Sequence, residues 1–133
     1  MKVLSLVVLC LAVSACVTTY NPRYYYSNIE VANLTGETIR NVKVQIGPEG
    51  RTLECAEVTN NRLCQQRYVK RVYPNAMIQL SWQSSDGQQM SAQMNPSVPL
   101  TLVPSQSLRV MMDIAEDGSV KFYFKQDDAR LGG

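Results

Sequence analysis

Apolar and polar residues alternate along much of the chain. Val42, Val44 and Ile46 are separated by single polar residues, and the same spacing recurs over residues 78–83, 89–94, 108–114 and 120–124. A period of two places one side chain on each face of a strand in turn, so each segment predicts a strand with one buried and one solvated face. No stretch keeps a helical period over any length.

Turn-forming residues separate these segments. They follow one another at gaps of about ten to thirteen residues, apart from a longer gap after Asn95. The turn signals are Thr35-Gly36, Gly47-Pro48, Thr59-Asn60-Asn61, Pro74-Asn75, Asp86-Gly87, Asn95-Pro96 and Asp117-Gly118. Such spacing is typical of an all-β sandwich or barrel. We predict a small antiparallel two-sheet sandwich of seven or eight strands, immunoglobulin-like in general character.

Three local predictions refine this fold. Asp86-Gly87 and Asp117-Gly118 each predict a hairpin, because a tight turn needs residues that tolerate positive φ. Residues 95–106 contain three prolines, which lack the backbone donor of a sheet, so we expect a connection that crosses between sheets, with a short edge strand at Leu100–Val103. Trp82 is in register with Ile78 and Leu80 and is expected in the core.

The N-terminal segment has the pattern of a secretory signal peptide. Lys2 precedes eleven residues, Val3 to Val13, that are apolar except for Ser5. A permanent membrane span needs roughly 20 apolar residues, whereas a signal peptide has about 7–15 followed by small residues. The alternative, a buried N-terminal helix of a cytoplasmic domain, agrees less well with the polar residues 18–28 that follow. We therefore expect residues 1–15 to be removed.

The four residues at the end of this run carry a resemblance. Val13-Ser14-Ala15-Cys16 resembles the lipobox of bacterial lipoproteins, in which the cysteine receives a diacylglyceryl group and becomes the acylated N-terminus. The resemblance covers residues 1–16 and implies that Cys16 holds the protein on a membrane through several acyl chains. Residue 17 is Val rather than the Asp that retains such proteins at the inner membrane. In a Gram-negative source this implies the outer membrane, with the domain facing the periplasm.

The remaining chain is the size of one domain. Residues 16–133 make 118 residues, which we divide into a lipidated tether (16–26), the sandwich (27–126) and a polar tail (127–133). Without Lys2 the chain has 12 Lys and Arg against 11 Asp and Glu, a net charge of +1. This nearly neutral charge gives no support for a nucleic-acid partner, because binding nucleic acid requires a strongly basic face.

The cysteines suggest a disulfide. Cys10 belongs to the signal peptide and Cys16 to the lipobox, which leaves Cys55 and Cys64. An even number in an oxidising compartment favours a bridge, and the turn-like Thr59-Asn60-Asn61 between them predicts a pinned hairpin. Two unpaired structural thiols remain the alternative. A metal site is disfavoured, since two cysteines without any histidine do not supply four ligands.

Catalytic chemistry finds little support. The chain has no histidine, which excludes the Ser-His-Asp and Cys-His arrangements. A carboxylate pair stays open, but the candidate acids, Glu49, Asp86, Glu116 and Asp117, lie in turns, where acids are common for local reasons. Calcium ligation by Glu116-Asp117 and Asp127-Asp128 lacks the spacing of an EF-hand. We expect a protein that is not an enzyme and holds neither cofactor nor metal.

Two groups of residues are candidate binding surfaces. Every charged residue between Asn60 and Ser85 is basic, with tyrosine interleaved; the candidates are Arg62, Arg67, Tyr68, Lys70 and Arg71. They are expected to meet anionic lipid, polysaccharide or an acidic partner, or else to guard an edge strand against pairing. The second group is Tyr24, Tyr25 and Tyr26 beside the tether, which suit an interface or pack against the first strand.

Three functions are consistent with these observations. The preferred one is a non-catalytic outer-membrane lipoprotein that is anchored through its N-terminal lipid. Its sandwich is a binding or assembly module for another envelope component, and we expect that component to be a protein. An inhibitor or enzyme of peptidoglycan turnover is the second, on grounds of size and class alone. Direct binding of anionic lipid or polysaccharide through residues 62–71 is the third. The sequence leaves a small-molecule ligand unknown.

Overall fold

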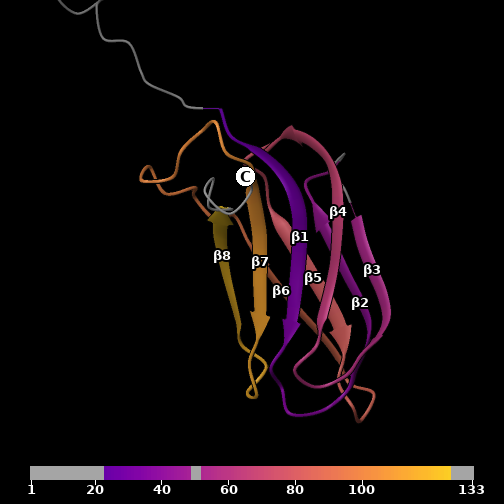
Figure 1. The fold of residues 1–133 in the computed structure, drawn as a ribbon. Coiled ribbons are helices and arrows are strands. Elements are labelled where there is room, and N and C mark those ends of the chain that lie inside the picture. The colour runs from indigo at the N-terminus through magenta and orange to yellow at the C-terminus, as the bar shows by residue number, and fades with distance from the viewer. Residues whose placement is uncertain (1–22, 49–51, 127–133) are drawn as a thin grey trace, which may run out of the picture.

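The computed structural model describes residues 23–48 and 52–126, which form a β-sandwich without helices (Figure 1). The eight strands are β1 (Tyr25–Asn33), β2 (Ile39–Ile46), β3 (Thr52–Val58), β4 (Leu63–Val72), β5 (Ile78–Gln83), β6 (Gln89–Met94), β7 (Leu108–Ile114) and β8 (Val120–Gln126). The predicted two-sheet architecture is confirmed. Within the described part of the chain, no helix is long and apolar enough to cross a membrane.

Each sheet has four strands. Sheet A has the order β4-β1-β7-β8 and sheet B the order β3-β2-β5-β6. All neighbouring pairs are antiparallel except β1 and β7, which run parallel, with Tyr26 opposite Leu108. The strand order and this parallel pair were not predicted, because alternation describes a strand's faces and not its neighbours. Residues 95–107 cross from β6 in sheet B to β7 in sheet A, as predicted.

Alternation accounts for the core between the sheets. Val42, Val44 and Ile46 of β2 are buried, while Lys43 between them is exposed. Ile78, Leu80 and Trp82 of β5 are likewise buried, so the expected core position of Trp82 is confirmed. Burying each such side chain stabilises the fold by roughly 1.5–3 kcal/mol. β1, in the middle of sheet A, is buried on both faces over Asn28–Val31.

Both hairpins are present, but the predicted edge strand is absent. Gly87 and Gly118 have φ of +86° and +85°, conformations that glycine adopts without strain, and each closes a turn between paired strands. Leu100–Val103 does not form a strand. Instead, Leu102 N donates to Pro99 O at 3.1 Å and Gln106 N to Val103 O at 3.1 Å, so this proline-rich segment folds into consecutive turns.

The strands define two ends of the sandwich. We call the N-terminal end the one at which β1 starts; residues 47–48, 73–77 and 95–107 also lie there, uppermost in Figure 1. The distal end holds the turns 34–38, 59–62, 84–88 and 115–119. The signal peptide, the lipobox, most of the tether and the tail fall outside the described residues. The domain itself starts before residue 27, because Tyr24 is buried and β1 begins at Tyr25.

Candidate binding surface

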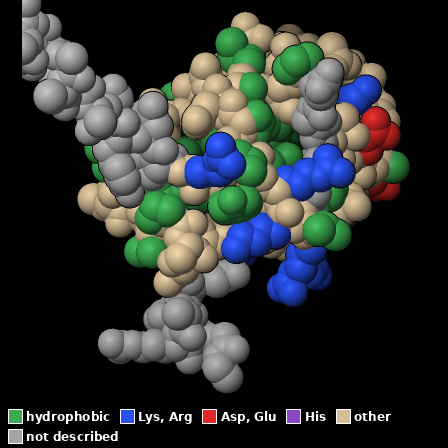
Figure 2. Space-filling view, turned by 90° about the horizontal axis from the view of Figure 1, so that it is seen from above, with side chains coloured by type: hydrophobic (Ala, Val, Ile, Leu, Met, Phe, Trp, Pro, Cys, Tyr) green, Lys and Arg blue, Asp and Glu red, His purple; other side chains and the backbone are tan. Residues whose placement is uncertain are grey.

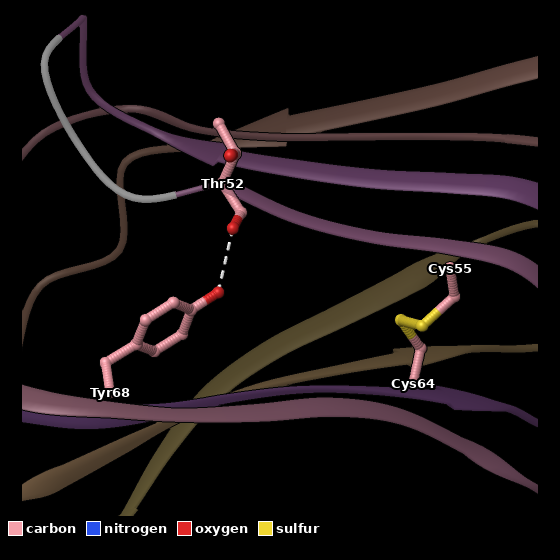
Figure 3. The surroundings of a disulfide bond; sticks show 4 residues. All are labelled: Thr52, Cys55, Cys64 and Tyr68. Atoms are coloured by element: carbon pink, nitrogen blue, oxygen red, sulfur yellow. Dashed lines mark hydrogen bonds between the residues drawn. A yellow bond between two sulfur atoms is a disulfide. The ribbon is translucent and has the colours of Figure 1, made fainter.

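A disulfide closes one long side of the sandwich. The Sγ atoms of Cys55 in β3 and Cys64 in β4 are bonded, with 6.1 Å between the Cα atoms, which confirms the predicted pairing (Figure 3). The predicted hairpin is wrong, because β3 belongs to sheet B and β4 to sheet A. The bridge therefore joins the edges of the two sheets. The Tyr68 hydroxyl donates to Thr52 O at 2.8 Å and adds a second tie on the same side.

β4 is an edge strand, and the basic residues on it do not form one surface. Arg62 lies in the distal turn before β4, whereas Arg71 lies near its other end. At about 3.3 Å per residue they are separated by about 30 Å. In the pairing of β1 with β4, Tyr26 is opposite Arg71 and Asn28 is opposite Arg67. Three residues of β4, Tyr68, Val69 and Lys70, therefore face the single residue Ser27 and form a bulge. The bulge interrupts the alternation, which is why the sequence could not assign these residues to faces.

Arg67 lines a small polar hollow on the outer face of sheet A. Ser27, Asn28, Tyr68 and Arg109 line it with Arg67, and its volume is about 260 Å³. Asn28 is buried, and its Oδ1 has no hydrogen-bond partner among the described residues. Arg109 Nη2 lies 2.7 Å from Oε1 of Glu30, whose side chain is only 3% exposed. Because Glu30 neutralises Arg109, Arg67 supplies the remaining charge of this hollow.

Two of the three tyrosines proposed for the surface are core residues. Tyr24 and Tyr26 are 6% and 2% exposed. The Tyr24 hydroxyl donates to Leu102 O at 3.3 Å, and the Tyr26 ring meets the Tyr73 ring edge-on at 5.9 Å between centroids. The prediction that Tyr24 and Tyr26 belong to a binding surface is therefore wrong. The alternative, that these tyrosines pack in the core around the first strand, agrees with their burial. Tyr25 is half-buried, with Lys70 Nζ 5.1 Å from its ring centroid.

Basic and apolar side chains gather at the N-terminal end (Figure 2). Four exposed cations lie there: Arg23, Lys70 and Arg71 close to the start of β1, and Lys125 near the end of β8. The described loops of this end contain no Asp or Glu. Of the eight large hydrophobic residues that are exposed in the described part, five are at this end: Val72, Met77, Met94, Leu100 and Val103.

The distal end is acidic instead. Glu37, Asp86, Glu116 and Asp117 surround a hollow of about 370 Å³ that Trp82 also lines. Hydrogen bonds from Ser84 and from the backbone hold the pKa of Asp86 below its ordinary value, and those from Ser119 do the same for Asp117. These bonds close the two hairpin turns, and Ser85 also bonds Glu37. The local turn chemistry predicted for these acids accounts for their positions.

Two further observations concern sites where chemistry could take place. Among the described residues, no group of three or more Cys, Asp or Glu could hold a metal ion. Burial, and to a smaller extent the neighbouring Tyr26, raise the pKa of Tyr73 to about 12, but this residue lies in the core between Tyr26 and Phe124. Within residues 23–48 and 52–126, the largest group of exposed cations and apolar side chains is the one at the N-terminal end.

Sequence reasoning missed the apolar part of this surface. Leu100 is 80% exposed and Val103 45%, whereas the sequence predicted only a short edge strand at Leu100–Val103. Their proline-rich context was the available signal, since consecutive turns cannot bury every apolar side chain they carry. Lys125 was not considered either, because it is distant in sequence from Lys70 and reaches the same end only through the pairing of β8 with β7.

Comparisons with known proteins do not assign a family. No family model matches the chain, and no curated protein does. A solved structure described as the NMR structure of a protein from Eubacterium rectale is similar, with 14% identity and a TM-score of 0.48, over 81% of this chain and 93% of that one. A likeness of this extent carries no argument about function.

Proposed function

We propose that this chain is an outer-membrane lipoprotein of a Gram-negative envelope, anchored by lipid on Cys16. Its periplasmic sandwich is a non-catalytic binding or assembly module for another envelope protein. The lipobox supports the anchor, and the absence of histidine from the whole chain supports a non-catalytic role. The partner site we propose is the open side of β4.

One observation carries the choice of β4. Within the described residues no strand pairs with its outer side, and at ten residues it is the longest strand of either sheet. It exposes Leu63 and Val69, the latter 82% exposed. The edge strand β8 carries exposed Lys121 and Lys125 within its regularly paired length, and lysine on an edge opposes strand pairing. The lysine of β4, Lys70, lies in the bulge and outside the regularly paired residues 63–67.

The binding mode we propose is strand addition. Residues 63–67 pair with β1 in regular register, so their outward backbone groups are available to an extended segment of a partner. Main-chain hydrogen bonds would supply affinity, and contacts with Leu63 and Val69 would supply specificity. The disulfide at Cys64 holds this part of β4 in place before the partner arrives, which lowers the entropy lost on binding.

The test is covalent capture from the native host. The full-length lipoprotein carries a photoreactive amino acid at position 69, or, as a matched control, at position 93, an exposed site on the edge strand β6. One protein crosslinked at 69 and not at 93 is the expected result. A second variant, Val69→Lys, should reduce copurification of that protein more than tenfold, whereas Gln93→Lys should not.

Cys16→Ala completes the experiment. If the anchor is required for encounter, this form should lose the partner although its sandwich is unchanged. Identical crosslinks at positions 69 and 93 would refute the proposed site. Capture of peptidoglycan hydrolases alone, with their activity inhibited by excess protein, would favour the inhibitor alternative instead.

A further inference from the structure

We infer that the N-terminal end of the sandwich is a docking surface for anionic phospholipid headgroups, which holds the domain upright on its membrane. The inference goes beyond the proposed function and rests on it in one respect, the lipid anchor at Cys16. Three independent features of this end support it: the distribution of charge, the exposed apolar side chains and the point at which the chain enters.

Charge separates along the long axis of the domain. Arg23, Lys70 and Arg71 mark the N-terminal end, and its described loops contain no acid. Four carboxylates, against the single cation Arg62, occupy the turns of the distal end: Glu37, Asp86, Glu116 and Asp117. An anionic surface therefore attracts one end and repels the other. Basic residues close to such a surface are drawn to it within about one Debye length, roughly 8 Å at physiological salt.

The apolar side chains of this end match the chemistry of a headgroup layer. Leu100 and Val103 extend from the turns of the crossing segment, and Val72 from the end of β4, beside Arg71. A soluble surface seldom gathers large exposed hydrophobic residues in one place without a binding role. Surfaces that bind a membrane interface combine basic side chains with apolar ones. The basic side chains contact anionic headgroups, and the apolar ones contact the boundary of the acyl chains.

The chain enters the sandwich at this same end. Tyr25, where β1 starts, is nine positions after Cys16, and even a fully extended chain spans only about 30 Å over these nine steps. A lipid on Cys16 would thus confine this end to the neighbourhood of the bilayer. Confinement raises the effective concentration of the headgroups, so weak attraction by a few cations is sufficient for docking.

β8 supplies a matched pair of reporters. Lys121 and Lys125 lie over the same Tyr123 ring, at 5.1 and 5.8 Å from its centroid, but Lys121 is nearer the distal end and Lys125 nearer the N-terminal end. Their immediate surroundings are similar, while their distances from a docked membrane would differ. Lys70 is a second reporter of the N-terminal end, and Lys43 on sheet B is a second control.

The test uses the full-length protein made in a bacterium that processes lipoproteins, reconstituted into vesicles. One set contains phosphatidylcholine and the other includes one third phosphatidylglycerol. Amine acetylation followed by mass spectrometry measures each lysine. With phosphatidylglycerol, Lys70 and Lys125 should react at least threefold more slowly, Lys43 and Lys121 should be unchanged, and 1 M salt should abolish the difference. The variant Lys70→Glu/Arg71→Glu should lose the protection of Lys125, whereas Lys121→Glu should keep it.

The possible outcomes test the docking surface and the lipid anchor separately. Protein that sediments with both kinds of vesicle, with equal labelling in each, overturns the docking surface and leaves the anchor intact. Protein that sediments only with anionic vesicles, with Lys70 and Lys125 protected, supports docking and contradicts the anchor. Protein that sediments with neither overturns both.

Discussion

Cys55 and Cys64 bond an edge strand of one sheet to an edge strand of the other. The bridge spans the gap between the layers at the side where β3 and β4 run next to each other, and Tyr68 binds Thr52 O further along the same side. The pair thus limits how far the two sheets can separate there. It also fixes the part of β4 to which we assign partner binding.

Removing this bridge should destabilise the domain measurably. Cys55→Ser/Cys64→Ser frees a loop of about ten residues in the unfolded chain, and the chain-entropy relation gives a loss of roughly 2.5–3 kcal/mol in the free energy of unfolding. Urea denaturation of the variant, and of the original protein with and without a thiol reductant, measures it. A variant as stable as the oxidised protein would show that the bridge does not stabilise the domain.

The ion pair between Glu30 and Arg109 predicts an asymmetric response to mutation. Arg109→Met leaves the buried Glu30 carboxylate without its partner, and loss of one member of such a pair costs about 3 kcal/mol. Glu30→Met/Arg109→Met removes both charges and should recover most of that loss. Thermal denaturation of the three proteins tests this. Equal destabilisation by the single and the double substitution would contradict the prediction.

The two hairpin glycines provide a matched comparison. At positive φ, alanine at Gly87 or Gly118 should lower the free energy of unfolding by roughly 1 kcal/mol, or about 4–8 °C in Tm. A Cβ at Gly87 meets no atom within 4 Å, whereas one at Gly118 lies 3.0 Å from Cε of Met90. Gly118→Ala should therefore be the more destabilising, by the small cost of moving the end of the Met90 side chain. Calorimetry of both variants resolves the order.

Tyr73 should make the protein sensitive to alkali. Its folded pKa is raised to about 12 from an ordinary value of 10.0, mainly by burial, so the folded state keeps a proton that the unfolded state releases. The corresponding stability is complete below pH 10 and is lost as the pH rises from 10 to 12, by roughly 2–3 kcal/mol. Urea midpoints between pH 8 and 12 measure the loss.

Tyr73→Phe is the control for that experiment. The Tyr73 hydroxyl is buried and has no hydrogen-bond partner among the described residues, so its removal should leave stability near neutral pH unchanged or slightly higher. The variant should lose less stability than the original protein above pH 10. An identical alkaline profile would assign the loss to other groups.

The sequence by itself determined the local properties of this protein. Alternation fixed which face of β2 and β5 is buried, including the place of Trp82, because a period of two is a property of a single strand. Asp86-Gly87 and Asp117-Gly118 determined their hairpins, because positive φ is a local requirement. The pairing of Cys55 with Cys64 followed from their number and the expected compartment.

Only the tertiary structure decided how these pieces meet. The parallel pairing of β1 with β7, the position of the disulfide between sheets and the burial of Tyr24 and Tyr26 depend on contacts between residues distant in sequence. The same contacts bring Lys125 to the end of the sandwich where Lys70 lies. Local pattern specifies the face of a strand, but its neighbours are selected by the packing of the whole core, and so a shared surface became visible only when the two sheets were assembled.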